Sequence, residues 1–170
     1  VVITSLIRWL SLILILCPSF LVYGVEVCAL RMPFVSTDKE VGLKGKEYSY
    51  VSLIHGEVAI QRGKLPQNFR DDEVIVEVEY IGICRADVKE VYAGRDIPKD
   101  RGPLFGHELV GKVIFAGKKT GFSIGERISF NPNITPDRTT GFAEYFMIKG
   151  TKEVLAKALN TIPNGISTEM

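Results

Sequence analysis

Residues 74–87 have the sequence VIVEVEYIGICRAD, and this stretch is the strongest indication of the fold. The valines of this stretch alternate with glutamates, and a period of two residues predicts a β-strand with one buried face and one polar face. The strand runs directly into Cys84, and residues 87–93 are predicted to form a short helix. Asp87 lies in the first turn of that helix, where a negative charge is favourable. The stretch therefore predicts a strand that ends at a thiol and is followed by a helix.

Short apolar runs separated by turn residues lie on both sides of this strand. A hairpin turn is predicted at His55-Gly56, with His55 on the surface. The other predicted strands cover residues 47–54, 57–62, 109–116, 127–130 and 142–149. Many short strands with one brief helix indicate a mainly β fold, either a small barrel or a sandwich. The sequence contains neither GxGxxG nor GxxxxGK[ST], so a dinucleotide-binding domain is not expected within it.

The composition predicts a globular domain that has no affinity for nucleic acid. The 170 residues suffice for one domain with a core, 24% of them are charged and 46% are apolar, and the formal net charge is +1. Binding of nucleic acid usually needs a basic stripe, which this balance does not provide. The cysteines at positions 17, 28 and 84 have no regular spacing, so they do not form a disulfide framework. They indicate a reducing compartment, and we expect a cytoplasmic protein.

Residues 1–45 differ from the rest and are predicted to be an apolar extension and linker, with the domain at residues 46–170. No residue is charged at positions 9–25, and Pro18 would interrupt a helix in that run. The chain does not begin with methionine, so the preferred interpretation is an extension that does not belong to the domain. The alternatives are a signal segment or membrane anchor formed by residues 6–25 and, least favoured, a core helix.

A thiol and an imidazole in this part of the sequence could hold a metal ion, and each has a carboxylate close to it in the sequence. Cys84 offers a thiolate and His107 an imidazole, which are ligands that zinc prefers, and a catalytic zinc usually takes three protein ligands. Glu108 and Asp87 are carboxylates beside them, and a carboxylate next to a ligating imidazole can fix its tautomer. Each residue taken singly also has a structural interpretation, as a buried thiol, a hydrogen-bonded histidine or a solvated carboxylate. Spacing alone leaves both interpretations open.

The order of three motifs resembles the catalytic domain of the zinc-dependent medium-chain dehydrogenases, the family of alcohol, polyol and threonine dehydrogenases. The motifs are Gly82-Ile83-Cys84-x-x-Asp87, Gly106-His107-Glu108-x-x-Gly111 and Gly121-Phe122-x-x-Gly125-x-Arg127. The resemblance extends from about residue 46 to residue 170. It implies a partly open β-barrel like that of the co-chaperonin GroES, with short helices, preceded here by the apolar N-terminal segment.

The resemblance also implies a role for each site residue. Cys84 and His107 match two ligands of the catalytic zinc, and Glu108 matches a carboxylate that lies behind the metal and can approach it. Asp87 matches the carboxylate that supports the ligating histidine, and Arg85 matches a position that contacts the pyrophosphate of the cofactor in some members. The implied activity is oxidation of an alcohol or polyol, with zinc as Lewis acid and hydride passing to the nicotinamide of NAD or NADP.

Several features depart from the family pattern. Ala86 stands where many members have a serine or threonine that relays the alcohol proton, and Lys89 stands where some have a relay histidine. Residues 131–141 contain no cysteine, so the structural zinc of many members would lack ligands. The third catalytic ligand and the nucleotide-binding domain would be expected after Met170. We therefore expect an N-terminal piece of a homo-oligomeric enzyme, inactive by itself.

Two other classes of protein stay open at this point. One is a zinc-free reductase of the same fold, of the quinone reductase kind, although members of that class usually lack the pair formed by Cys84 and His107. The other is a barrel module without enzymatic activity, attached to a membrane through residues 10–23. Metal content tests the first alternative, and membrane fractionation tests the second.

Overall fold

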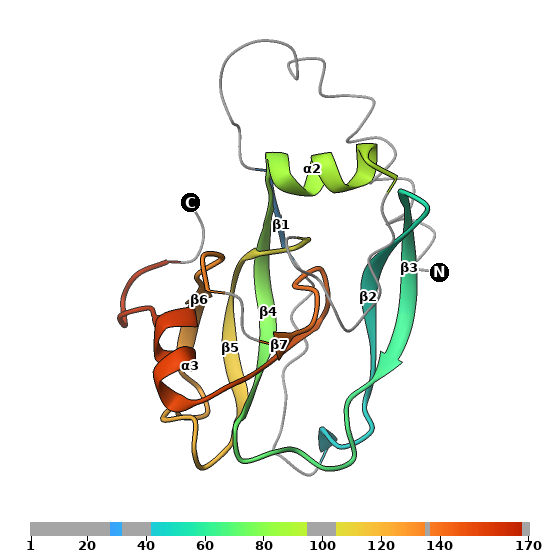
Figure 1. Cartoon of the computed structure of the whole chain (residues 1–170). Helices are drawn as coiled ribbons and strands as arrows, with labels where there is room; N and C mark the ends of the chain where they lie inside the picture. The colour runs from blue at the N-terminus through green and yellow to red at the C-terminus, as the bar shows by residue number, and fades with distance from the viewer. Residues whose placement is uncertain (1–27, 32–41, 95–104, 135–136, 168–170) are drawn as a thin grey trace.

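Figure 1 shows a computed structural model of the chain, which describes residues 28–31, 42–94, 105–134 and 137–167. The strands are β1 (Cys28–Arg31), β2 (Glu47–Ile54), β3 (Glu57–Lys64), β4 (Glu73–Ile83), β5 (Glu108–Ala116), β6 (Arg127–Phe130), β7 (Asp137–Arg138), β8 (Tyr145–Lys149) and β9 (Leu159–Thr161), and the helices are α2 (Arg85–Tyr92) and α3 (Lys152–Ala158). The predicted apolar run at residues 9–25 lies outside this description. Within the described part, neither helix combines the length and the apolar character needed to cross a membrane.

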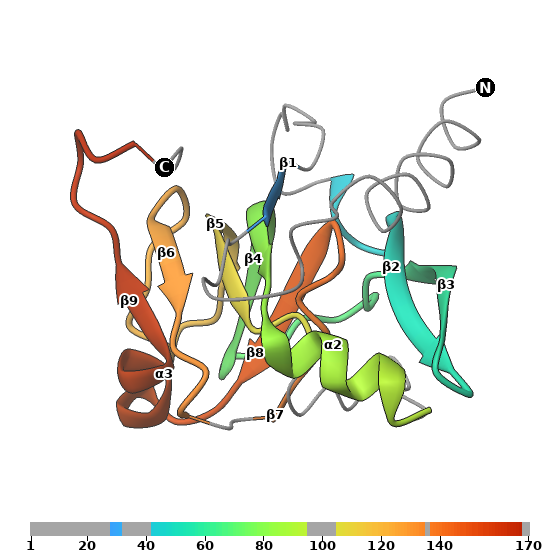
Figure 2. The same cartoon turned by 90° about the horizontal axis from the view of Figure 1, so that it is seen from above.

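One antiparallel sheet dominates the structure, and its strands follow the order β7-β8-β4-β5-β6-β9 with β1 beside β4. Strands β2 and β3 pair with each other in a separate hairpin. In Figure 2, α2 continues from one end of β4, and α3 lies beside β9. The two end strands β7 and β9 are not bonded to each other, so the described strands form an open sheet rather than a closed barrel. The prediction of a mainly β fold with short helices is confirmed.

β4 is the central strand of this sheet and has hydrogen-bonded neighbours on both edges. Residues Glu73–Glu77 pair with β8, Val74–Gly82 pair with β5, and Tyr80–Ile83 pair with β1. Pairing on both edges satisfies backbone groups that would otherwise be left without partners in the interior. The segment that the sequence places in the extension thus contributes a strand, β1, next to the end of β4 that leads to Cys84.

Both faces of β4 are buried, so the prediction of a half-buried strand is wrong. Val76 lies in one apolar cluster and Ile75 lies in a second cluster on the opposite face. Glu77 shares the face of Ile75 and is 9% exposed, because Tyr48 of the hairpin and its neighbours cover this face as well. Burial raises the pKa of the Glu77 carboxyl, and nearby lysines oppose that effect. The alternating glutamates predicted a solvated face, but one of them, Glu77, therefore lies in the interior.

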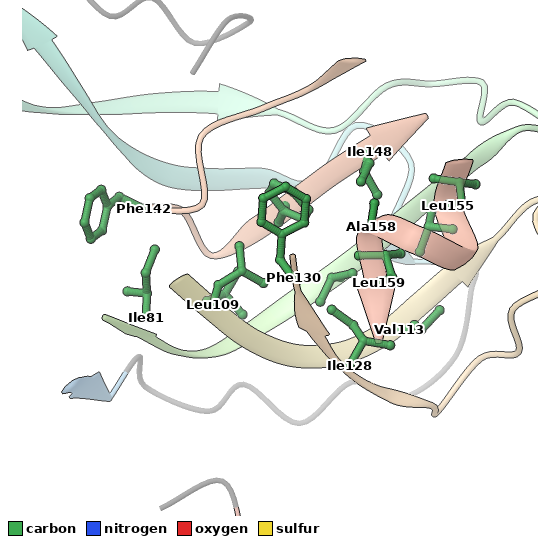
Figure 3. Packing of buried hydrophobic residues seen from close by; sticks show 14 of the residues in the cluster. Ile81, Leu109, Val113, Ile128, Phe130, Phe142, Ile148, Leu155, Ala158 and Leu159 are labelled. Atoms are coloured by element: carbon green, nitrogen blue, oxygen red, sulfur yellow. The ribbon is translucent and has the colours of Figure 1, made fainter. Parts of the chain in front are cut away.

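The larger apolar cluster packs the sheet against α3, as Figure 3 shows. Its members include Ile81, Leu109, Val113, Ile128, Phe130, Phe142, Ile148, Leu155, Ala158 and Leu159. The cluster extends to the loop before β5, where the rings of Phe105 and Phe142 meet edge to face with centroids 4.7 Å apart. This contact anchors the loop from which His107 projects, because aromatic pairs of this geometry are favourable beyond the area they bury.

Local differences from the predicted elements have identifiable causes. Helix α2 begins two residues earlier than predicted, because its cap residue, Cys84, directly follows the last residue of β4. The strand predicted at residues 142–149 begins at Tyr145, since the preceding residues form a loop. The short strand β7 was not predicted, and it forms because its two residues pair with β8. His55 is exposed in the hairpin turn, as predicted.

Candidate metal centre

The junction between β4 and α2 positions the thiol of Cys84. Cys84 is the residue that caps α2, and its Sγ accepts a hydrogen bond from the N–H of Ala86 at 3.2 Å. In return, Oδ2 of Asp87 accepts the N–H of Cys84 at 2.8 Å. This reciprocal arrangement is a capping box, in which two backbone donors at the start of a helix both find acceptors. The sulfur is therefore held at a defined position by the fold of its own segment.

The loop before β5 positions the imidazole of His107. Gly106 has φ +65°, and a Cβ added there would lie 2.6 Å from the backbone nitrogen of Phe142, so this position requires glycine. The N–H of Gly106 donates to Oδ1 of Asp87 at 2.8 Å. The N–H of Gly141 donates to the carbonyl oxygen of Gly106 at 3.1 Å. Bonds to two distant segments thus hold the residue that precedes His107.

The structure brings Cys84, His107 and Glu108 together. Sγ of Cys84 lies 3.3 Å from Nε2 of His107. One ligand atom from each of the three residues lies within 4.8 Å of the others. Cys84 is partly buried, His107 is buried and Glu108 is exposed, so the group opens to solvent on the side of Glu108. A thiol, an imidazole and a carboxylate that converge in this way form a donor set suited to zinc.

Asp87 lies behind the imidazole and joins both halves of the site. Its carboxylate is 2% exposed, and Oδ1 lies 3.8 Å from Nδ1 of His107. That separation is longer than a hydrogen bond, but it places a negative charge next to the ring nitrogen opposite Nε2. Because both oxygens of Asp87 are held by backbone N–H groups, the charge has a fixed position. A carboxylate placed in this way favours the ring orientation in which Nε2 faces Cys84.

The thiol of Cys84 is protonated at neutral pH in the metal-free protein. Burial raises its pKa above the ordinary value, and the negative charge of Asp87 acts in the same direction. Backbone N–H groups of Asp87 and Ala86 stabilise the thiolate and partly oppose that rise in pKa. A metal that binds the thiolate therefore has to displace a proton.

Three other residues considered in the sequence analysis lie on α2, and one supporting residue, Thr140, was found only in the structure. Arg85 and Lys89 are exposed, and Ala86 is partly buried and carries no hydroxyl group. Thr140 was not anticipated: its Oγ1 donates to the carbonyl oxygen of Phe105 at 3.4 Å and so supports the loop before His107. No local pattern could have indicated this role, because the contact joins residues 35 positions apart.

Known proteins with similar sequences share this part of the chain. Residues 70–160, more than half of the chain, match the alcohol dehydrogenase GroES-like domain. The sorbitol dehydrogenase of Bombyx mori is 32% identical over 90 residues, covering 49% of this chain and 25% of that protein. An uncharacterized zinc-type alcohol dehydrogenase-like protein of Escherichia coli is 38% identical over 69 residues, covering 38% of this chain and 20% of that protein. The chain thus spans a quarter or less of the length of these two relatives.

Solved structures with low sequence identity share the fold. The 2R,3R-butanediol dehydrogenase of Bacillus subtilis matches with a TM-score of 0.53 at 19% identity, covering 71% of this chain and 42% of that one. The galactitol-1-phosphate dehydrogenase of Escherichia coli matches with a TM-score of 0.54 at 20% identity, covering 72% of this chain and 40% of that one. The residues that match the family model, 70–160, include the whole segment from β4 to α3 that carries the converging thiol and imidazole. The chain therefore belongs to the family of alcohol dehydrogenase GroES-like domains.

Proposed function

We propose that this chain is the catalytic-domain part of a zinc-dependent oxidoreductase that transfers hydride between an alcohol or polyol and NAD or NADP. The observation that carries the proposal is the approach of Cys84 Sγ and His107 Nε2 to 3.3 Å, with Glu108 beside them, inside a domain of this family. Relatives named sorbitol dehydrogenase and D-xylulose reductase support an alcohol or polyol as substrate class. Because the chain spans a quarter of those two proteins, the activity is proposed for the whole enzyme.

The donor geometry fits zinc. A tetrahedral zinc with a sulfur ligand at about 2.3 Å and a nitrogen ligand at about 2.0 Å holds those two atoms about 3.5 Å apart. The observed separation of 3.3 Å between Cys84 and His107 is close to this value. Glu108 is near enough to offer a carboxylate oxygen as a further ligand. When bound, zinc supplies Lewis-acid chemistry toward an alcohol oxygen, and the nicotinamide takes the hydride.

Each protein group then has a task in binding, orientation or proton transfer. Asp87 keeps the imidazole of His107 turned so that Nε2 faces the site. Ala86 offers no hydroxyl, so we propose that the alcohol proton leaves through water or through a second hydroxyl group of a polyol. Arg85 is exposed in the first turn of α2, where its guanidinium is available to the pyrophosphate of the cofactor. The complete enzyme is proposed to be a cytoplasmic homo-oligomer.

The test is the zinc content of the purified chain and of three variants. We expect about one zinc per wild-type chain, and a loss of at least about tenfold in Cys84→Ser and in His107→Ala, since each removes a principal ligand. The matched control is His55→Asn, which removes an exposed imidazole from a turn position whose φ of 53° asparagine tolerates. Equal zinc in all four proteins would remove the site from consideration, and absence of zinc from the wild type would favour the zinc-free reductase class.

A further inference from the structure

The hairpin formed by β2 and β3 contacts both halves of the candidate metal centre, although it contributes none of the candidate ligands. The two strands form a sheet of their own, beside the larger sheet in Figure 1. The converging group consists of Cys84, which caps α2, and of His107 and Glu108, which lie where β5 begins. Two segments that are 23 residues apart in the chain therefore have to be held at the correct separation.

The turn of the hairpin lies against the end of α2. Gly56 has φ +78°, and a Cβ added there would lie 2.6 Å from Cα of Gly94 and 2.8 Å from the carbonyl oxygen of Val91. Figure 1 shows the same approach, with the turn between β2 and β3 next to the last turn of α2. An α-helix is a stiff unit, because hydrogen bonds join each turn to the next. Contact at its far end therefore helps to fix the direction of α2 and the position of Cys84 at its start.

The middle of the hairpin contacts a second segment, residues 141–144, which we call the connecting segment. The N–H of Val51 donates to the carbonyl oxygen of Phe142 at 2.7 Å, and Tyr50 forms an antiparallel β-bridge with Ala143. These contacts extend the pairing of β2 beyond the hairpin itself. They attach the connecting segment to β2 through the main chain.

Glu144 completes this pairing with its side chain. The N–H of Glu144 donates to the carbonyl oxygen of Ser49 at 3.1 Å, and Oε2 of Glu144 accepts the N–H of Ser49 at 2.7 Å. The main-chain carbonyl oxygen of Glu144 has a different partner, since it accepts the N–H of Val78 in β4 at 3.0 Å. The carboxylate therefore takes the place of a backbone acceptor. Because a hydrogen bond to an ionised acceptor is stronger than one between neutral groups, this carboxylate is a principal link between the hairpin and the connecting segment.

The connecting segment in turn supports the loop from which His107 projects. The N–H of Gly141 donates to the carbonyl oxygen of Gly106 at 3.1 Å, and the ring of Phe142 meets that of Phe105 with centroids 4.7 Å apart. A Cβ on Gly106 would lie 2.6 Å from the backbone nitrogen of Phe142, so the two backbones are in direct contact. In an interior packed this closely, a displacement of the connecting segment moves Gly106 and His107 with it.

We infer that the hairpin β2–β3 is a brace for the metal centre and that Glu144 is the positioning residue through which it acts on His107. The inference rests on the proposed metal site. The hairpin touches α2 through Gly56 and the His107 loop through the connecting segment, so it holds the two halves at one separation. Metal–ligand bonds have narrow ranges of length, and changes in the groups that support ligands commonly weaken metal binding. Glu144 acts through position, since it is outside the converging group of ligands.

The test compares the full chain with variants at Glu144 in two measurements. Zinc affinity is measured by competition with a chelating indicator, and the absorption spectrum of the chain loaded with Co²⁺ reports the geometry of the ligands. Glu144→Leu removes the acceptor of the Ser49 N–H, and Glu144→Gln keeps an oxygen that can accept it. The matched control is Thr151→Val, which removes the side-chain acceptor of another backbone N–H, that of Val154 in α3.

We expect Glu144→Leu to bind zinc about 3- to 30-fold more weakly than the wild type and to shift the Co²⁺ absorption bands. Glu144→Gln should have the wild-type spectrum and stay within about twofold of the wild-type zinc affinity, because the bond to Ser49 is kept. Thr151→Val should lower the urea midpoint and leave both metal measurements unchanged, because the lost bond lies within α3.

A second pair of variants tests the contact with α2. Gly56→Ala places a methyl group against the backbone of Gly94, whereas the same group in Gly45→Ala meets the amide end of the Gln67 side chain, which can move. The two glycines have similar positive φ angles, 78° and 69°, so the backbone strain is similar. We expect zinc affinity to fall at least about threefold in Gly56→Ala and to stay normal in Gly45→Ala. This pair decides the inference if Glu144→Leu does not fold.

A wild-type affinity and spectrum in Glu144→Leu, with normal binding by the wild type, overturn the inference and leave the metal site standing. Equal losses of affinity in Glu144→Leu and Thr151→Val also overturn it, because weaker binding would then follow from a general loss of stability. A Glu144→Gln variant as weak as Glu144→Leu contradicts the role of the acceptor. A wild-type chain that binds no more zinc than Cys84→Ser overturns the proposed function and the inference together.

Discussion

The backbone N–H of Gly106 lies 2.8 Å from Oδ1 of Asp87, a bond that ties the loop before β5 to the first turn of α2. The other oxygen of the same carboxylate accepts the N–H of Cys84. The buried side chain of Asp87 thus holds Cys84, which is a proposed ligand, and Gly106, which precedes the proposed ligand His107. This relationship makes the candidate metal centre sensitive to changes at a residue that is not a candidate ligand.

Replacement of Asp87 by alanine is expected to destabilise the metal-free chain strongly. The change leaves the N–H groups of Cys84 and Gly106 without their acceptor, and lost bonds to a charged group in the interior cost about 2–4 kcal/mol. Asp87→Asn should cost less, because its amide oxygen can still accept one of the two bonds. Urea unfolding measures both. The control is Glu108→Gln, an exposed position, where a change beyond about 0.5 kcal/mol would contradict this account.

Replacement of Gly106 by alanine is expected to cost more than the same change at Gly94. Both glycines have similar positive φ angles, 65° and 62°, so both substitutions impose the same backbone strain of about 1 kcal/mol. A Cβ at Gly94 meets nothing within 4 Å, whereas a Cβ at Gly106 would lie 2.6 Å from the backbone nitrogen of Phe142. We expect an additional loss of about 1–3 kcal/mol at Gly106.

The pair of glycine variants also separates local strain from the metal site. The Gly106→Ala chain should bind zinc more weakly, because His107 follows directly, and the Gly94→Ala chain should bind it normally. Urea midpoints and zinc titrations on both chains provide the comparison. Equal destabilisation of the two variants would show that the contact with Phe142 is relieved at little cost.

Thr140→Val is expected to destabilise the chain by about 1–3 kcal/mol, while Thr140→Ser should be close to neutral. Oγ1 of Thr140 donates to the carbonyl oxygen of Phe105 and accepts the N–H of Phe142, and the residue is 1% exposed. Valine preserves the shape and removes both bonds, whereas serine preserves the hydroxyl group. Thermal or urea unfolding of the two variants tests this assignment, and a valine variant as stable as the serine variant would refute it.

Glu77 is expected to make the stability of the chain decrease as pH rises from about 4 toward neutrality. Burial raises the pKa of its carboxyl in the folded state, so the folded protein favours the protonated form. The stability associated with that form is complete below the unfolded pKa of about 4.3 and is lost as pH rises through the folded value. Glu77→Gln mimics the protonated form, so its effect on stability should become more favourable between pH 4 and pH 7.

The control for this pH dependence is Glu57→Gln, at an exposed position of the hairpin turn. Its effect on the unfolding free energy should be the same at pH 4 and pH 7. Urea unfolding at several pH values measures the difference between variant and wild type. If the effect of Glu77→Gln on the unfolding free energy does not change with pH, then the lysines near Glu77 fully compensate the burial of its carboxylate.

Much of the fold could be predicted from the sequence because the signals are local. The strand at residues 47–54 has the predicted bounds, and the hairpin turn follows from His55-Gly56. The helix after Cys84 was predicted from residues within one turn of its start. The structure adds that Cys84 and Asp87 form a capping box at that start. The candidate ligands were likewise named from residue types and short motifs, which need no knowledge of distant contacts.

The sequence by itself therefore predicted the strands β2 to β6 and β8, the helix after Cys84 and the candidate ligands, since alternation, capping and short motifs depend on neighbouring residues. Tertiary structure decided what surrounds them: the burial of Glu77, the strand β1 beside β4, and the bond between Thr140 and Phe105. These features join residues that are tens of positions apart, and burial is a property of all the elements that cover a residue, so no local pattern encodes them.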